Sequence, residues 1–175
     1  MTHLAVSAIG ADQPGIVAAV TRVLVDRGCN LEDASMSILR GHFAMMLVVA
    51  APASAEAAEL EREIAAATAP LGLVVVVRAI DEGSHSAAPG DEWTVSLYGA
   101  DRPGIVHAVS AALADAGANI TDLATRVVGA ADRPVYAMFL DVTTPPGLDL
   151  GSVLGGVAEA LGVSCTAQRA EADIL

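Results

Sequence analysis

A short loop motif occurs twice in this chain and carries residue types that could bind a small charged molecule. The first copy reads Gly10-Ala-Asp-Gln-Pro-Gly15 and the second reads Gly99-Ala-Asp-Arg-Pro-Gly104. A helix-forming segment follows each copy. A helix N-terminus offers unpaired backbone N–H groups and a partial positive charge to a carboxylate, and an Asp side chain suits an ammonium group. The motif therefore predicts a binding site for a zwitterion such as a free amino acid.

The residues expected to contact such a ligand lie in the two loops and just beyond the helix that follows each loop. Gly15 and Gly104 have no Cβ, so they let a ligand approach the backbone closely. An asparagine recurs in the same register after each helix, and its side-chain oxygen suits an ammonium group. The candidates are Gly10, Asp12, Pro14, Gly15 and Asn30 in the first half, and Gly99, Asp101, Pro103, Gly104 and Asn119 in the second.

Each candidate also has a purely structural interpretation. Asp12 and Asp101 are suited to cap the next helix, and Pro14 fits its first turn, where a missing N–H costs nothing. The loop glycines suit tight turns, and an asparagine that closely follows a helix-ending glycine commonly bonds to nearby backbone. The binding interpretation therefore depends on the loop and the asparagine recurring together.

Catalytic and metal-binding chemistry has no comparable repeated pattern. None of the four histidines and neither of the two cysteines occupies the same place in both halves. The sequence contains no phosphate-binding Gly-x-x-x-x-Gly-Lys loop and no metal-ligand spacing. Acid–base catalysis by Asp12 and Asp101, brought together across an interface, is the alternative. We expect no catalytic residue, no metal and no cofactor.

Composition and charge exclude several classes of protein. The chain has 175 residues, 54% of them hydrophobic, and a formal net charge of −12. This charge opposes a phosphate backbone, so we expect no direct binding of nucleic acid. No apolar run reaches the roughly 18 residues that a membrane-spanning helix needs, and the N-terminus lacks the basic residues of a signal peptide. We therefore expect a cytoplasmic protein that does not enter a membrane.

The two halves are expected to fold alike. Each starts with a β-branched apolar strand, then has a helix that a glycine ends, Gly28 in one half and Gly117 in the other. After the first helix, Ala34, Met36 and Ile38 alternate with polar residues, which predicts a strand with one buried face. A hairpin at residues 40–42, a helix over 57–71 and a strand over 73–80 complete the first half, and segments 150–161 and 163–170 correspond to the last two.

This order of elements, βαββαβ, predicts an α+β protein of two ferredoxin-like domains. Each domain is expected to be a four-stranded antiparallel sheet with two helices on one face. The predicted domains cover residues 1–80 and 92–175. Residues 81–91, which contain Gly, Ser, Pro and charged residues, are expected to form the linker.

The loop motif resembles the ACT domain, because after one helix it is followed by Gly-Cys-Asn-Leu or Gly-Ala-Asn-Ile. With Asn30-Leu-Glu-Asp33 and Phe43-Ala-Met-Met-Leu-Val-Val49, the chain is similar to the tandem ACT proteins of the glycine cleavage system transcriptional repressor family. The resemblance implies that ACT domains pair side by side and that an effector binds at the pair interface, near the loop before the first helix.

The same resemblance implies that the matching Asp12, Asp101, Asn30 and Asn119 contact the effector. Some effector-binding members have a histidine where this chain has glycine at the first loop position, so the resemblance does not name the ligand. We expect a non-enzymatic regulatory protein that senses a small metabolite, such as glycine or serine, and forms a homodimer. It would act through contacts with a regulatory or enzyme protein partner, and one setting is transcriptional regulation of amino-acid metabolism. The alternatives are a ligand-free interaction scaffold and a regulatory subunit of a metabolic enzyme.

Overall fold

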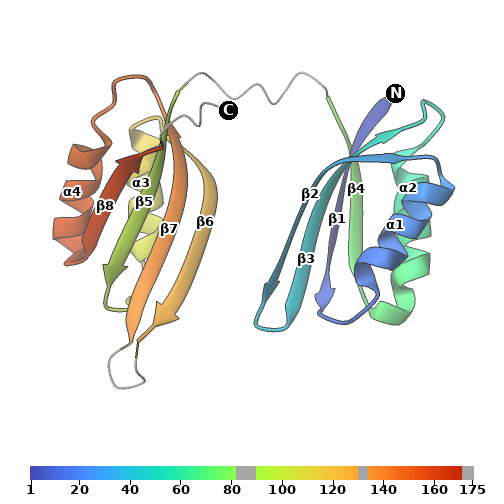
Figure 1. Cartoon of the computed structure of the whole chain (residues 1–175), viewed down its shortest axis with the longest axis horizontal. Helices are drawn as coiled ribbons and strands as arrows, with labels where there is room; N and C mark the ends of the chain where they lie inside the picture. Colours follow the sequence, from blue (N-terminus) through green and yellow to red (C-terminus); the bar gives the residue numbers. More distant parts are fainter. Residues whose placement is uncertain (82–89, 130–133, 171–175) are drawn as a thin grey trace. The chain divides into compact units, whose positions relative to one another are not determined.

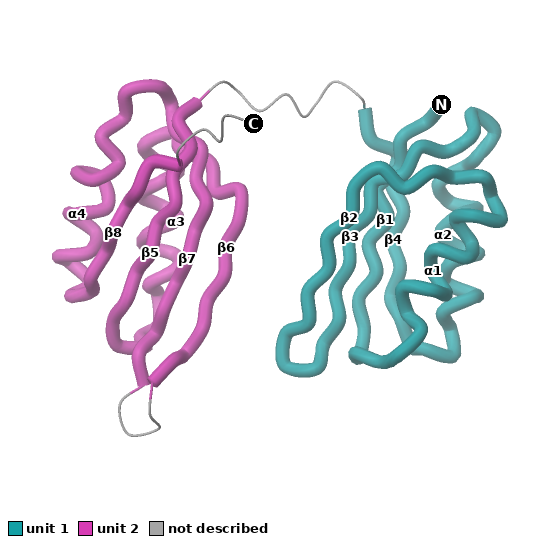
Figure 2. Tube along the Cα trace, in the orientation of Figure 1, with its two compact units in different colours: residues 1–86 teal, residues 87–175 magenta. Residues whose placement is uncertain are grey.

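The computed structural model describes residues 1–81, 90–129 and 134–170. The chain divides into two compact units, residues 1–86 and 87–175, which we call the first and second unit (Figure 2). Most of the predicted linker over 81–91 lies outside the described residues, and the first strand of the second unit already begins at Asp91.

The first unit has the predicted order of elements. They are β1 (Thr2–Ala11), α1 (Ile16–Asp26), β2 (Asn30–Leu39), β3 (His42–Ala51), α2 (Ala57–Thr68), a 3-10 turn (Ala69–Leu71) and β4 (Val74–Ile80). The strands form one antiparallel sheet in the order β2-β3-β1-β4. Both helices lie on one face of this sheet (Figure 1).

The second unit repeats this arrangement. Its elements are β5 (Asp91–Gly99), α3 (Ile105–Asp115), β6 (Asn119–Val128), β7 (Val135–Thr144), α4 (Leu150–Leu161) and β8 (Ser164–Arg169). The sheet order is β6-β7-β5-β8, so the strands correspond one to one with those of the first unit. The prediction of two βαββαβ, ferredoxin-like units is confirmed. Gly28 and Gly117 have φ angles of 66° and 73° just after α1 and α3, as expected for residues that end a helix.

Each unit has its own core between the sheet and its two helices. In the first unit every second residue of β1 is buried against the helices, at Leu4, Val6 and Ala8. Helix α1 contributes Ile16, Val20 and Leu24 at helical spacing. The second unit uses the equivalent Ile105, Val109 and Leu113 of α3. We call the sheet face away from the helices the open face.

The prediction that β2 buries one face is wrong. Ala34, Met36 and Ile38 pair with Leu47, Met45 and Phe43 and share their side of the sheet. All ten residues of β2 are nevertheless exposed. The reason is position: β2 is the outermost strand, and side chains that face the helix layer there are not covered by a helix. Alternation predicted the two faces of the strand correctly, but burial depends on what lies above them.

Helix α4 has a side-chain cap that the sequence analysis did not single out. The carboxylate of Asp149 accepts hydrogen bonds from the backbone N of Ser152 (3.1 Å) and from its hydroxyl (2.6 Å). These bonds from Ser152 hold the pKa of the Asp149 carboxyl below its ordinary value, because they favour the charged form. The cap is therefore strongest when Asp149 is ionised.

Replacing this cap gives a pH-dependent prediction. Asp149→Ala should lower the urea midpoint of the second unit, measured by the fluorescence of Trp93, the chain's single tryptophan. Because the folded-state pKa is depressed, the charge-dependent stabilisation is present above the unfolded pKa and is lost as pH falls through the folded one. The control is Asp149→Asn, which retains a capping side chain but should lose that pH dependence. Equal midpoints for all three proteins at neutral pH would refute a stabilising cap.

Candidate functional site

The two repeated loops occupy equivalent places, between the first strand and the first helix of each unit. Helix α1 begins at Ile16 and α3 at Ile105, and the residue before each helix is a glycine in the left-handed conformation. Gly15 has a φ of 95° and Gly104 a φ of 93°. Their carbonyls accept the first helical bonds, from Ala19 and Ala108, at 2.9 Å each. A left-handed backbone strongly favours glycine, so these two residues have a structural requirement of their own.

The prediction that Asp12 and Asp101 cap these helices is wrong. Neither helix receives a side-chain cap from the described residues, and the capping position belongs to the glycine. The prediction that Pro14 lies in the first helical turn is wrong for the same reason, because the helix begins two residues later. The first turns also contain no acidic residue within the described helices. The backbone N–H groups at these N-termini are thus left to solvent or to a ligand.

The two copies of the loop motif differ at one residue, Gln13 or Arg102, and the side chain of this residue holds each loop in place. The side-chain amide of Gln13 donates to the carbonyl of Leu71 at 2.7 Å. In the second unit Arg102, at the corresponding position, donates to the carbonyl of Leu161 at 3.0 Å. In both units the acceptor lies at the end of the second helix or in the turn that follows it. Sequence comparison of the two halves missed this role because Gln and Arg differ, although both can donate to a carbonyl.

Gly10 and Gly99 are explained by packing. A Cβ built on Gly10 would lie 2.5 Å from Cδ2 of Leu73, and one on Gly99 would lie 2.4 Å from Cγ1 of Val163. Both neighbours belong to the segment that leads into the last strand of the unit. The close approach of two chain segments therefore accounts for these glycines, whether or not a ligand binds.

The predicted asparagines lie at the other end of the sheet from the loops. Asn30 pairs with Ala50, which pairs with His3 at the start of β1. The backbone N of Asp12 lies just past the end of β1 and donates to the carbonyl of Gly41 at 2.8 Å. Nine strand residues separate these rows, which is a distance on the order of 30 Å. One small ligand cannot touch both Asp12 and Asn30 of the same unit.

The second unit has the same separation. Asn119 pairs with Thr143, opposite Glu92 near the start of β5, whereas the loop follows Gly99 at the end of that strand. The structure thus brings Asp101, Pro103 and Gly104 together with the N-terminus of α3, but it does not bring Asn119 to them within the unit. Figure 1 shows β1 and β5 running from one end of their sheets to the other.

Comparison with known proteins assigns the family. A profile of the ACT domain matches residues 2–78, and a second ACT-domain profile matches residues 93–150. The chain belongs to the ACT-domain family. The two matches fall in the two units, so each unit is one ACT domain.

Three relatives show how far the similarity of this tandem ACT protein extends. It is 25% identical over 174 residues to the glycine cleavage system transcriptional repressor of Escherichia coli, covering 98% of this chain and 88% of the relative. It is 43% identical to a UPF0237 protein of Methanopyrus kandleri over 79 residues, which cover 45% of this chain and 88% of the relative. A solved structure from Galdieria sulphuraria superposes with a TM-score of 0.81 at 28% identity, covering 97% of this chain and 99% of the other.

Three further findings on the described residues concern metal binding, the two cysteines and membrane-spanning helices. Within the described ranges no group of three or more His, Cys, Asp or Glu side chains could hold a metal ion. Cys29 and Cys165 are free and half-buried, and burial raises the pKa of both thiols above the ordinary value. Burial therefore favours the neutral thiol over the reactive thiolate. No described helix is long and apolar enough to cross a membrane.

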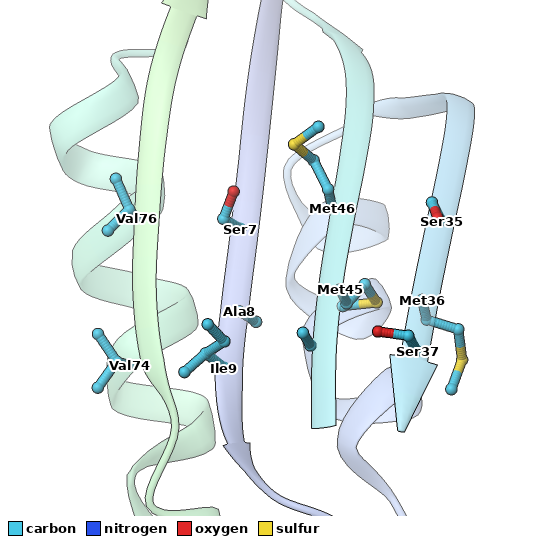
Figure 3. Close-up of a pocket in the computed structure, with 11 residues that line it drawn as sticks. Ser7, Ala8, Ile9, Ser35, Met36, Ser37, Met45, Met46, Val74 and Val76 are labelled. Carbon is cyan, nitrogen blue, oxygen red and sulfur yellow. The ribbon is translucent and has the colours of Figure 1, made fainter. Parts of the chain in front are cut away.

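A hollow in the first ACT domain lies elsewhere, on the open face of the sheet. It has a volume of about 420 Å³ and contains none of the predicted site residues. Its lining comes from all four strands, as Figure 3 shows, and includes Ser7, Met46, Ser35 and Val76. Sequence analysis missed this surface, although the run of small and apolar residues on these strands was a usable signal.

Proposed function

We propose that this protein is a non-enzymatic regulator that binds a small amino acid, such as glycine or serine, and acts through a protein partner. The observation that carries the proposal is the uncapped N-terminus of α1, repeated at α3 with the same left-handed glycine. Membership of the ACT-domain family supports a ligand-sensing role for such a loop. Two equivalent loops in one chain provide two candidate sites.

The proposed binding mode places the ligand carboxylate on the free N–H groups at the start of the helix. The helix dipole favours an anion there, and the backbone donors already point toward it. Asp12 or Asp101, both exposed, would accept from the ligand ammonium group. Pro14-Gly15 and Pro103-Gly104 would form the wall of the site, since glycine leaves the backbone accessible.

The asparagine of the predicted site would come from a second ACT domain. Strand β2 is an edge strand whose residues are all exposed, and Asn30 is its first residue. Antiparallel pairing of two such edges sets the start of one strand beside the end of the other. Asn30 of one domain would then approach the loop end of its neighbour, as the proposed side-by-side homodimer requires. Such an arrangement makes the site complete only in the assembly.

The regulatory output is proposed to pass through protein contacts. The E. coli relative is a transcriptional repressor by name, which supports a place in the control of amino-acid metabolism. A net charge of −12 opposes direct binding of DNA, because phosphate repels a negatively charged surface. The proposed partner is therefore a regulatory protein or an enzyme, and the proposed location is the cytoplasm.

The test combines calorimetry with the two loop aspartates. Glycine and L-serine are titrated into the wild type and into the variant Asp12→Ala with Asp101→Ala. We expect the double variant to lose tenfold or more in affinity, because a charge-assisted contact is removed. Its unfolding free energy should stay within about 0.5 kcal/mol of the wild type, since neither carboxylate caps a helix.

A matched control removes the same charges from the other ends of the same helices. Asp26→Ala with Asp115→Ala changes two exposed aspartates at the last residues of α1 and α3. This variant should bind like the wild type. Unchanged affinity in the Asp12/Asp101 variant would move the ligand site away from the loops. A wild type that binds none of the proteinogenic amino acids would leave the chain as an interaction scaffold.

A further inference from the structure

The open face of the first unit's sheet is apolar and uncovered within that unit. Ile9, Met46 and Val74 are 59%, 56% and 65% exposed, and Val76 beside them is 40% exposed. They lie on three neighbouring strands around the hollow in Figure 3. A contiguous exposed apolar surface of this kind is typical of an interaction site.

The residues of this face form rows across the sheet. Paired residues of neighbouring antiparallel strands point to the same side, so the register gives each row directly. Read in the order β2, β3, β1, β4, the rows are Ser35, Met46, Ser7, Val76; then Ser37, Ala44, Ile9, Val74; then Asp33, Val48, Ala5, Arg78. Each row holds both large and small side chains.

We propose that this face binds the same face of a second copy of the chain, around a two-fold axis that runs close to the strand direction. Such an axis sets the outer strand β2 against β4 of the partner subunit, and the inner strand β3 against β1 of the partner subunit. Stacked sheets pack about 10 Å apart with their strands nearly aligned, so residues of equivalent rows meet.

Shape supports this pairing. Met46 lies opposite Ser7 of the partner subunit, and Ile9 lies opposite Ala44 of the partner subunit. On the outer strands Val76 and Val74 lie opposite Ser35 and Ser37 of the partner subunit. Every large apolar side chain therefore meets a small one, which is how the inner faces of stacked sheets interdigitate. The hollow of about 420 Å³ leaves room for the partner's longer side chains.

Charge supports the same axis. Asp33 and Arg78 are exposed, and they occupy opposite edges of one row. The two-fold axis brings Arg78 to Asp33 of the partner subunit, and symmetry repeats the ion pair on the other edge. A two-fold axis perpendicular to the strands would instead stack each strand on its own copy, which separates Arg78 from Asp33. The charges thus select one of the two symmetric arrangements.

The open face of the second unit fits a self-pairing less well. Its row equivalent to the Asp33–Arg78 row holds Asp122, Asp141, Thr94 and Gln168. Self-pairing there would desolvate four carboxylates in the two copies without a cation in that row, which is costly. We therefore assign the contact to the first unit. The contact uses a sheet face, whereas the proposed amino-acid site uses a sheet edge and a loop.

The test is the mass of the full-length protein in solution, from light scattering across the micromolar range. The wild type should be an assembly of at least two chains. Met46→Glu and, separately, Arg78→Asp should each halve its mass, because one buries a charge and the other sets a carboxylate against Asp33. Combining Arg78→Asp with Asp33→Arg should restore the wild-type mass. Val25→Glu, at an apolar position on α1 that is 69% exposed, is the control and should change nothing.

A cross-linking variant makes the test independent of those substitutions. Ser35→Cys and Val76→Cys lie on opposite edges of the sheet, about 14 Å apart, which is too far for a disulfide within one unit. The facing positions lie on sheets about 10 Å apart, beyond the reach of a disulfide, so a short bismaleimide is used to join them. Treatment of this double variant with the bismaleimide should give a covalent dimer, and each single variant should not. A monomeric wild type, an unchanged mass for Met46→Glu, or no cross-link would overturn the proposal. A wild type that has the expected mass but binds no amino acid would instead contradict the proposed function alone.

Discussion

Leu140→Ala is expected to destabilise the second unit by about 2–5 kcal/mol. Leu140 lies on β7 in the middle of the sheet, is 1% exposed and belongs to the core cluster with Leu97 and Leu113. Removing its side chain loses the transfer free energy and leaves a cavity that the central strands cannot close. A small domain has only about 5–15 kcal/mol in total, so the loss is a large share. Urea unfolding followed by Trp93 fluorescence measures it within the same unit.

The matched control is the neighbouring residue in the same row. Leu123 on β6 pairs with Leu140 and faces the same side of the sheet, but it is 42% exposed because it lies on the edge strand. Leu123→Ala removes the same atoms and should cost well under half as much. Similar losses for the two substitutions would mean that β6 is covered in solution by a surface not described within the second unit.

Gly99→Ala is expected to destabilise the second unit by about 1–3 kcal/mol. The new methyl group would lie 2.4 Å from Cγ1 and 3.0 Å from Cβ of Val163. Val163 is β-branched and has few alternative rotamers, so the backbone must move to relieve the contact. The urea midpoint from Trp93 fluorescence again gives the measurement.

A substitution of Val163, the residue that the new methyl group would meet, supplies the control. Val163→Ala removes Cγ1, the nearest atom that the new methyl group would meet, and leaves Cβ at 3.0 Å, so Gly99→Ala should cost less in that background than in the wild type. Gly10→Ala should cost less than Gly99→Ala, because its nearest contact at 2.5 Å is the end of the flexible Leu73 side chain. If Gly99→Ala is harmless alone, the close packing at this position is not what requires glycine.

The sequence predicted the fold well because the decisive signals are local. Each signal lies within a few residues: hydrophobic alternation, helical spacing, and the helix-ending glycines Gly28 and Gly117. The duplication repeats these signals in the second half of the chain. The structure confirmed the order βαββαβ in both halves. Membership of the ACT-domain family agrees with it.

The helix caps could not be predicted from the sequence as easily as the fold. Asp12 has the right residue type and lies close to a helix, yet the cap position belongs to Gly15, three residues later. The choice depends on the φ angle of the glycine, which the sequence does not display. A left-handed glycine directly before a helix resembles, in the sequence, an ordinary glycine in a turn.

The burial of side chains and the assembly of the site were harder still to predict from the sequence, because both depend on segments that are distant in the chain. Met36 and Ile38 had the pattern of a buried face, but the sheet order places β2 at the edge. Asp12 and Asn30 recur together along the sequence, but α1 and the length of the sheet lie between them. Repetition shows that two residues are kept in register. It does not show that they meet in one domain.

The uncovered edge of β2 also affects whether molecules of this protein aggregate in solution. Edge strands are commonly protected by lysine, proline or a covering element, and β2 contains neither of those residue types. Growth of the sheet by continued strand addition is then opposed by the register shift between Leu31 and Asp33, by the charges of Glu32 and Asp33, and by repulsion between chains that each carry a net charge of −12. Added salt shortens the reach of that repulsion to about 3 Å at 1 M, which is less than one strand spacing. Raised ionic strength should therefore favour association of this protein through the β2 edge.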